Sequence, residues 1–235
     1  MPFETPHNNK RFVVLIANAK GGCGKTTLST NLASFYASRG HSTSLLDLDP
    51  QQSSLWWLKQ RSAELPAVQQ LALPNYSSLS STLLQQGIDR AASHLVIDSP
   101  AGLEPHSLNQ LLRLSQVVLI PVLPSAIDIH AVTRFLQTLM LTPSYRQRPR
   151  RIAVIANRAR VNTRAYAKLE RFLSSLKIPF LVTLRDTQQY VQAFESGHGI
   201  HELEGAEEGS DVAQWQLIAE WLEVQKLLSQ SLPSL

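Results

Sequence analysis

The feature that most constrains the fold is a glycine-rich loop set between a buried strand and a helix. Residues 12–17 (FVVLIA) form a continuous apolar run, which is typical of a strand buried on both faces of a parallel sheet. Glycines stand at positions 21, 22 and 24, and a helix is expected over residues 25–39, ended by Gly40. Glycines leave backbone N–H groups free to cradle phosphate oxygens at a helix N-terminus. This arrangement predicts a phosphate-binding loop in an α/β domain.

The rest of the chain alternates expected strands with expected helices. Further strands are expected at residues 43–48, 69–73, 94–98, 116–122, 151–156 and 180–184. Further helices are expected at residues 55–65, 77–91, 107–114, 128–141, 162–176, 187–196 and about 211–228, with a polar loop at residues 142–149. This order predicts a doubly wound, mostly parallel sheet flanked by helices. Residues 1–11 are expected to be an N-terminal tail, and residues 12–235 a single domain.

Composition excludes several classes of protein. Apolar residues make up 43% and charged residues 17% of the chain, as in ordinary globular proteins. No run approaches eighteen apolar residues, and the N-terminus lacks a basic region leading into an apolar segment, so neither a transmembrane helix nor a secretory signal is expected. The single cysteine, Cys23, excludes a disulfide, an iron–sulfur cluster and a zinc site within one chain, and the histidines show no metal-ligand spacing. We therefore expect a cytoplasmic protein.

Charge is distributed unevenly along the chain. Residues 144–185 hold 11 of the 22 basic side chains and a single acidic one, Glu170, whereas residues 186–235 hold nine acidic side chains and one basic one, Lys226. A basic block of this kind favours a polyanion as partner. The alternative is a solvated basic face that the acidic segment balances within the fold. Charge alone leaves both interpretations open.

The loop also carries a specific motif. Residues 20–27 read KGGCGKTT, which matches the deviant pattern KGGxGKTT with a second lysine at its start; the general eight-residue pattern would need glycine where this chain has Ala19. In this strand–loop–helix context the sequence resembles the ParA/MinD family of deviant Walker A P-loop ATPases, and most of all its small ParA members. Further family segments follow in order at residues 45–51 (LLDLDPQ), 94–102 (HLVIDSPAG), 117–132 and 155–158 (IANR). The resemblance therefore covers most of residues 12–200.

Phosphoryl transfer needs positioning and charge neutralisation more than covalent help, and the motif residues suit those tasks. The residues expected to bind ATP are Lys20, Gly21, Gly22, Cys23, Gly24, Lys25, Thr26, Thr27 and Asn157, the last as an adenine contact. The residues expected to hold Mg²⁺ are Thr26, Asp98 and Asp47. The expected catalytic residues are Lys25 on the β/γ-phosphates, Lys20 and Asp49.

The resemblance supplies four of these roles. It implies that Asp47 supports the metal shell and that Asn157 contacts the adenine. It implies that Lys20 reaches across an ATP-bound homodimer to the partner's nucleotide and that Asp49 orients or activates the attacking water. The alternative for Asp47 and Asp49 is that these carboxylates, at the end of a strand, cap the next helix. Cys23 is expected to act as a small packing spacer, and Trp56 and Trp57 as a helix packing face, with one of them able to report the nucleotide state.

The resemblance also bears on the basic block, because small ParA proteins bind DNA nonspecifically as ATP dimers. The expected DNA contacts are Arg146, Arg148, Arg150 and Arg151 on a surface loop, then Arg160, Arg164, Lys168, Arg171 and Arg185. Arg164, Lys168 and Arg171 are spaced to share one helix face. Few aromatic residues lie among them, which favours contact with the DNA backbone over sequence readout.

The expected function is therefore a slow ATPase that holds nucleoid DNA as an ATP dimer and is released when a ParB-like adaptor stimulates hydrolysis. Its cargo would be a plasmid, a chromosome region or a protein compartment. One alternative is a MinD-like membrane-associated ATPase, which would need basic residues beside the apolar face of its C-terminal helix; here Asp211, Glu220 and Glu223 outnumber Lys226, so that helix is expected to pack on the domain and no membrane partner is expected. The other alternative is a P-loop ligase of the amidating or dethiobiotin type.

Overall fold

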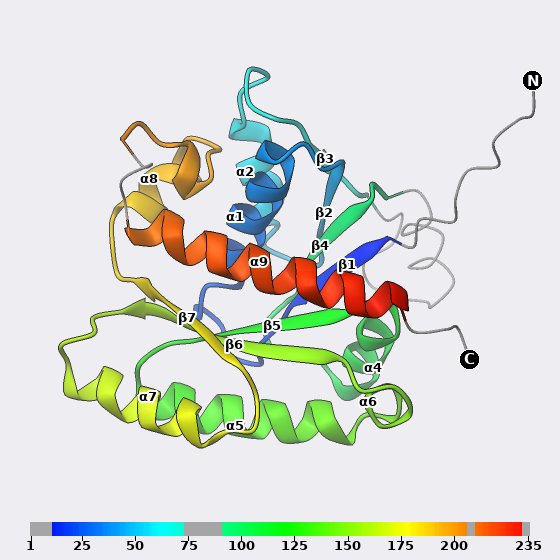
Figure 1. Cartoon of the computed structure of the whole chain (residues 1–235), viewed down its shortest axis with the longest axis vertical. Coiled ribbons are helices and arrows are strands. Elements are labelled where there is room, and N and C mark those ends of the chain that lie inside the picture. Colours follow the sequence, from blue (N-terminus) through cyan, green and yellow to red (C-terminus); the bar gives the residue numbers. More distant parts are fainter. Residues whose placement is uncertain (1–10, 73–90, 206–209, 232–235) are drawn as a thin grey trace, which may run out of the picture.

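The computed structural model describes residues 11–72, 91–205 and 210–231, and these form a parallel sheet with helices on both faces (Figure 1). The strands are β1 (Phe12–Ile16), β2 (Thr43–Asp47), β3 (Val68–Gln70), β4 (His94–Asp98), β5 (Val117–Val122), β6 (Arg151–Ala159) and β7 (Phe180–Arg185). The helices are α1 (Lys25–Ser38), α2 (Ser53–Gln60), α4 (Pro105–Leu114), α5 (Ala126–Leu141), α6 (Pro143–Gln147), α7 (Arg164–Ser175), α8 (Gln189–Glu195), the 3₁₀ helix η1 (Ile200–Glu202) and α9 (Ser210–Ser231). The expected α/β class is confirmed.

The strand order places β1 at the centre of the sheet. The order is β3-β2-β4-β1-β5-β6-β7, and every described pairing is parallel. On one side of β1 the chain forms β2 and then β3 outward, and β4 returns to lie between β2 and β1; the chain then crosses to form β5, β6 and β7 in order on the other side. In such a sheet the loop after the central strand lies at the switch point, where ligands bind outside the carboxyl ends of the strands.

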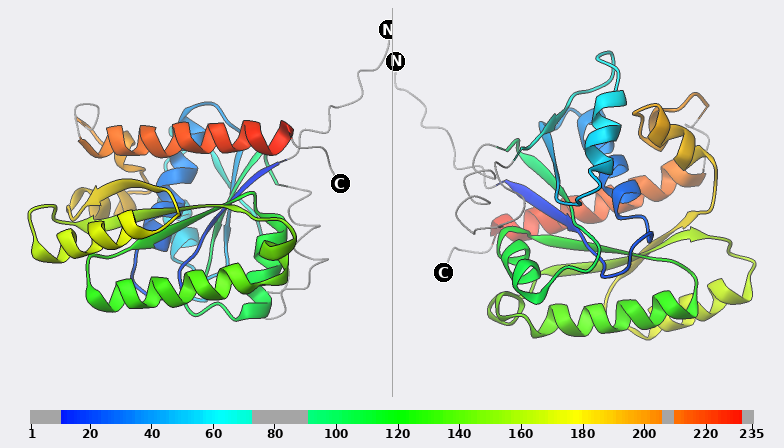
Figure 2. Two further views of the ribbon diagram at one scale, coloured as in Figure 1. Left: turned by 60° about the horizontal axis from the view of Figure 1, so that its bottom comes forward. Right: turned by 180° about the vertical axis from the view of Figure 1, so that it is seen from behind.

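Alternate residues of each buried strand pack against different helices, as the period of a strand requires. In β1, Val13 and Leu15 contact the core beneath α4, α5 and α7, whereas Val14 and Ile16 contact the core beneath α1, α8 and α9. Figure 2 shows the sheet between these two layers, with α5 on one side and α9 on the other. The near-continuous apolar runs follow from this burial on both faces.

The C-terminal helix packs on the domain as expected. In α9, Trp215, Ile218 and Leu222 are fully buried against the sheet, and Trp221 is partly buried. The Trp215 indole N–H donates to the Tyr190 hydroxyl at 3.1 Å, which fixes α9 to α8. Among the described helices, none has the length and apolar character needed to cross a membrane.

The structure corrects some expected boundaries. Residues 142–149 are not only a loop, because α6 occupies Pro143–Gln147; the Thr142 hydroxyl accepts a hydrogen bond from the Tyr145 N–H, and proline stands in the first turn. The helix expected at 55–65 is α2, which begins and ends earlier. The expected helix at 77–91 and the expected tail at 1–11 lie almost wholly outside the described residues.

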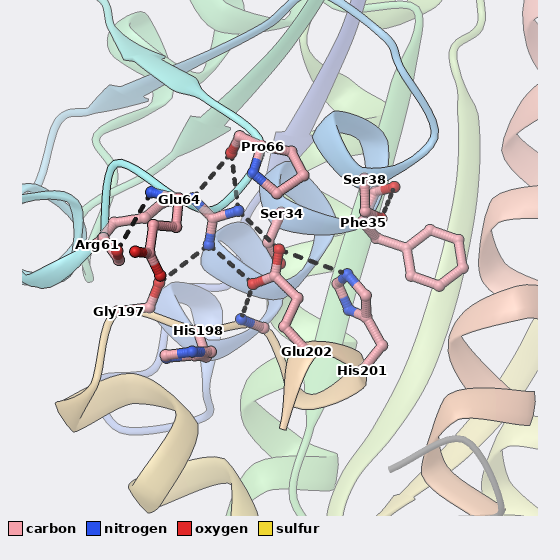
Figure 3. A network of polar contacts seen from close by, with 12 residues as sticks. Ser34, Phe35, Ser38, Arg61, Glu64, Pro66, Gly197, His198, His201 and Glu202 are labelled. Carbon is pink, nitrogen blue, oxygen red and sulfur yellow. Dashed lines mark hydrogen bonds and ion pairs between the residues drawn. The ribbon is translucent and has the colours of Figure 1, made fainter. Parts of the chain in front are cut away.

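A buried ion pair joins the end of α2 to η1 (Figure 3). Arg61 donates two hydrogen bonds to the Glu202 carboxylate, at 2.6 and 2.8 Å, and both side chains are more than nine-tenths buried. The same guanidinium donates to the carbonyls of Pro66 and Gly197, and Glu202 also accepts from the Gly199 N–H. Burial alone would raise the pKa of Glu202, but the bonds from Arg61 and Gly199 hold it below its ordinary value.

Glycine is required where this contact is tightest. Gly197 has a φ of +70°, and a Cβ there would lie 2.4 Å from the Arg61 backbone nitrogen. The backbone of the α8–η1 connection therefore lies directly against the end of α2. The ion pair and this close approach together hold α2 to α8 and η1.

Replacing Arg61 with methionine should destabilise the folded protein, because it leaves the buried Glu202 carboxylate without its partner. We expect Arg61→Met to lower the free energy of unfolding by about 3–5 kcal/mol, measured by urea denaturation. Lys59→Met, at an exposed position of the same helix, is the matched control and should change little. The double variant Arg61→Met/Glu202→Met should recover much of the loss; equal stability of Arg61→Met and Lys59→Met would contradict a structural role for the pair.

Candidate nucleotide-binding site

The loop between β1 and α1 is shaped by glycines. Gly22 and Gly24 have φ values of 74° and 96°, a region that other residues rarely adopt. A Cβ on Gly24 would lie 1.9 Å from the Asn157 amide nitrogen, so no side chain fits there. Among the described residues, no side chain caps the N-terminus of α1. Its first N–H groups therefore face the loop and suit an anion.

The two lysines of the motif point in different directions. Lys25 is buried, and its ammonium donates to the Lys20 carbonyl at 3.2 Å, so it lies over its own loop. Lys20 instead forms an ion pair with Asp128 of α5 at 3.0 Å, and one third of its side chain remains exposed. Asp128 is itself held in the first turn of α5 by Ser125, which caps that helix. The loop thus has one lysine inside and one at its rim.

Two carboxylates meet at the ends of adjacent strands. Asp47 ends β2 and Asp98 ends β4, and the parallel register pairs these two residues. Burial, together with the nearby Asp47 carboxylate, raises the pKa of Asp98 to about 7, against the lowering effect of hydrogen bonds from Ser54 and Thr26. Asp98 Oδ1 is buried and has no hydrogen-bond partner among the described residues. An unsatisfied carboxylate oxygen beside the Thr26 hydroxyl and the Lys25 ammonium fits a hard divalent cation such as Mg²⁺.

Asp47 caps the next helix, as one of the two interpretations of the sequence proposed. Its Oδ1 accepts from the Asp49 N–H at 2.9 Å, and its Oδ2 accepts from the N–H groups of Ser54 and Leu55 at the start of α2. Asp49 accepts from the Gln51 N–H within the same loop. The expected metal role of Asp47 and the expected water-positioning role of Asp49 stay predictions.

Beside the loop lies a pocket of about 390 Å³, within the range of roughly 300–1,000 Å³ typical of small-molecule sites. Its lining is made by Thr26, Thr27, Ser53, Asn157, Arg158, Arg185, Asp186, Thr187, Gln188, Tyr190, Val191 and Phe194. From the sequence, only Thr26, Thr27 and Asn157 were expected to contact the nucleotide. The segment from residue 186 to α8 carries no motif, so only its place after a strand of the same parallel sheet could have indicated it.

Asn157 and Cys23 hold the loop in place. Asn157 is buried at the pocket wall and donates its amide to the Cys23 carbonyl at 2.9 Å. The Cys23 thiol is fully buried and donates to the Lys20 carbonyl at 3.2 Å, and burial raises its pKa. A protonated, buried thiol agrees with the expected spacer role. The adenine contact of Asn157 stays a prediction.

The expected DNA contacts do not form one compact face. Arg146 to Arg151 precede or begin β6, with Arg146 on helix α6 and not on a loop, whereas Arg160 and Arg164 follow the end of this strand. A nine-residue strand spans roughly 25–30 Å, so the two groups lie at opposite ends of the strands, one at the amino ends and one at the carboxyl ends. Helix α7 runs back from the carboxyl ends of the strands toward their amino ends. It exposes Arg164, Lys168 and Arg171 to solvent on the face opposite its buried Leu169.

Several of these cations already have partners. Arg160 pairs with Asp186 at 2.9 Å, and Arg185 donates to the buried Asp211 at the start of α9. Arg150 is half-buried and donates to the carbonyls of Leu112 and Arg148. By contrast, six exposed candidates form no ion pair with a carboxylate of the described residues. These are Arg146, Arg148, Arg151, Arg164, Lys168 and Arg171.

Residues 14–200 match the family model of the CobQ/CobB/MinD/ParA nucleotide binding domain. The chain is 30% identical over 202 residues to the maintenance of carboxysome distribution protein A of Halothiobacillus neapolitanus, an alignment that covers 83% of this chain and 89% of the relative. The ATP complex of a Cyanothece McdA variant superposes with a TM-score of 0.65 at 17% identity and covers 96% of this chain and 98% of that one. The septum site-determining protein MinD of Pyrococcus horikoshii, complexed with Mg-ADP, superposes with a TM-score of 0.67 at 15% identity and covers 92% and 98%.

These comparisons agree with the geometry of the loop. Proteins of this fold hold ATP or Mg-ADP, and the orphaned Asp98 oxygen, the uncapped N-terminus of α1 and the adjacent pocket suit such a ligand. The two structures share the fold, and the family match spans the sheet from β1 to η1. The chain therefore belongs to the CobQ/CobB/MinD/ParA nucleotide-binding family and is a small ATPase of the ParA/MinD type.

Proposed function

We propose that this ATPase positions a cargo by binding DNA in its ATP state and leaving the DNA after hydrolysis. In this proposal, ATP joins two copies of the chain, the dimer binds nonspecific nucleoid DNA, and hydrolysis stimulated by an adaptor protein releases it. The observation that carries the proposal is the arrangement of the two loop lysines, one inside the loop and one at its exposed rim. The relative named for maintenance of carboxysome distribution supports a protein compartment as one class of cargo.

The dimer step rests on Lys20. Lys25 already occupies the inside of the loop, so a second lysine is not needed there to neutralise the same phosphates. Lys20 lies at the rim, where its ion pair with Asp128 would be exchanged for phosphates held by a second copy. Thr26 and Asp98 would hold Mg²⁺, which supplies neutralising charge to the phosphates during transfer.

The DNA step rests on α7. Arg164, Lys168 and Arg171 form an exposed basic stripe that the described carboxylates leave unpaired. Such a stripe suits phosphates of a duplex without sequence readout. Arg146, Arg148 and Arg151 form a second unpaired group at the other edge of the sheet, so the two groups can be tested separately.

The decisive experiment measures binding of a random-sequence duplex with no nucleotide, with ADP, with ATP and with a slowly hydrolysed analogue. Binding only with ATP or the analogue, falling steeply with salt, is the expected result. Absence of binding in every state would reject the DNA step and leave the ATPase. Anionic vesicles and carboxylate substrates of P-loop ligases would then distinguish the two alternatives.

The two basic groups should differ in their effect on DNA. We expect Arg164→Glu/Lys168→Glu to weaken DNA binding at least tenfold and to reduce the salt slope by about 2, because two phosphate contacts are lost. Nucleotide affinity should not change. Arg146→Glu/Arg148→Glu is matched in charge and should have the smaller effect; the reverse order would move the DNA face to the α6 edge.

The two lysines should separate nucleotide binding from dimerisation. Lys25→Ala should abolish ATP binding, because it removes the ammonium over the loop. Lys20→Ala should bind ATP but fail to dimerise and to retain DNA, measured by light scattering and duplex retention. If Lys20→Ala still formed an ATP-dependent dimer, this would contradict the assignment of Lys20 to the partner's nucleotide.

Trp56 should report nucleotide binding. Its indole is 44% exposed and stacks on Phe194, a pocket residue, with ring centroids 5.3 Å apart. Nucleotide entering the pocket should change the environment of this stack and hence the tryptophan fluorescence. Trp56→Phe should remove the signal, whereas Trp221→Phe, on the partly buried face of α9, should keep it.

A further inference from the structure

Three side chains converge at the edge of the sheet opposite the nucleotide pocket. They are His41, between α1 and β2, His94, the first residue of β4, and Glu223 of α9. Glu223 Oε1 lies 3.9 Å from His41 Nε2 and 3.7 Å from His94 Nε2. All three ligand atoms lie within 4.8 Å of one another, although the residues are far apart in sequence.

We propose that His41, His94 and Glu223 form a binding site for a divalent transition metal, with Zn²⁺ as the best match. Two imidazoles and one carboxylate are a common zinc ligand set that leaves a fourth position open. Imidazole donors favour zinc, cobalt or nickel over magnesium and calcium. Ligands of a tetrahedral zinc lie about 3.4 Å from one another, so the cluster needs only a small contraction.

The hydrogen bonds around His94 leave its Nε2 without a proton and thus able to bind a metal. Ser93 donates its hydroxyl to the Ser42 carbonyl at 3.0 Å, so its oxygen is left to accept from His94 Nδ1 at 3.1 Å. The proton therefore lies on Nδ1, and the lone pair of Nε2 faces His41 and Glu223. Metal-binding histidines are oriented in this way by a hydrogen bond to the second nitrogen.

Two buried oxygens at the cluster lack partners. Glu223 Oε1 and the Tyr36 hydroxyl are both buried, and neither has a hydrogen-bond partner among the described residues. Tyr36 is 1% exposed, and its ring packs against those of His94 and His41, with centroids 4.6 and 5.9 Å away. Buried polar atoms are rarely left unsatisfied, so the Glu223 oxygen beside two imidazoles suits a cation.

A side-chain cation already lies beside these metal-ligand atoms. The Lys226 ammonium lies 3.0 Å from His94 Nε2 and 3.5 Å from Glu223 Oε2. Its side chain is one fifth exposed and carries a flexible stem, so it can turn to solvent when a metal binds. Lys226 is thus a built-in competitor, and its removal should strengthen metal binding.

The sequence predicted no such site, because it offered one cysteine and no local histidine spacing. The ligands come together only because the later part of α9 reaches the start of β4. A metal there would tie α9 to β4 and to the end of α1, and it would stabilise the folded chain by mass action. The site would not contact the nucleotide pocket, so it does not depend on the DNA switch proposed above.

The test uses the untagged full chain, stripped with a chelator and kept in excess Mg²⁺ to occupy the nucleotide site. Co²⁺ is the probe, followed by its visible absorption, and Zn²⁺ is measured by competition. The unaltered chain should bind one ion, His41→Ala and Glu223→Gln should each weaken binding at least tenfold, and Lys226→Met should tighten it. His106→Ala, at an exposed position on α4, is the matched control and should bind as the unaltered chain does.

Thermal unfolding supplies an independent readout. Zn²⁺ should raise the midpoint of the unaltered chain and of Lys226→Met, and should leave those of His41→Ala and Glu223→Gln unchanged. Either of two results would overturn the proposal. One is Co²⁺ binding that is equal in His41→Ala, Glu223→Gln and the unaltered chain, and the other is no binding by either the unaltered chain or Lys226→Met.

Discussion

The central, fully buried position of β1 determines where every other part of the site lies. The chain passes from β1 to β2 on one side and from its neighbour β5 to β6 on the other, so the loop that follows β1 has open space at the carboxyl edge. The uncapped start of α1 and the carboxylate of Asp98 meet in that space. Because β1 is buried on both faces, the point at which the loop begins is fixed by both cores.

Helix α2 is held at both ends by interactions of different kinds. At its start, Asp47 accepts from two backbone N–H groups, and Ser54 donates to Asp98. At its end, Arg61 is paired with the buried Glu202. One short helix therefore links the carboxylate that is best placed for a metal to the segment that lines the nucleotide pocket.

Local signals in the sequence predicted the loop, the parallel sheet and the buried face of α9. The loop expected at 142–149 was wrong, because Thr142 and Pro143 supply the cap and the first turn of a helix. Contacts between distant segments were not predictable. The amide of Asn157 on Cys23, the closure of the pocket by α8 and the meeting of His41 with His94 depend on packing that no local pattern encodes.

The structure supports one of the two interpretations of the uneven charge, in which the acidic segment balances part of the basic block; the polyanion partner stays a proposal. At the carboxyl edge the acidic segment neutralises basic residues, through Asp186 on Arg160 and Asp211 on Arg185. The first pair is exposed, so phosphates could displace its carboxylate at little cost. The second has a buried carboxylate, and removing its arginine would leave an unpaired charge inside the protein. Arg185 is therefore committed to holding α9, whereas the stripe on α7 and the group of Arg146, Arg148 and Arg151 form no ion pair with a carboxylate of the described residues.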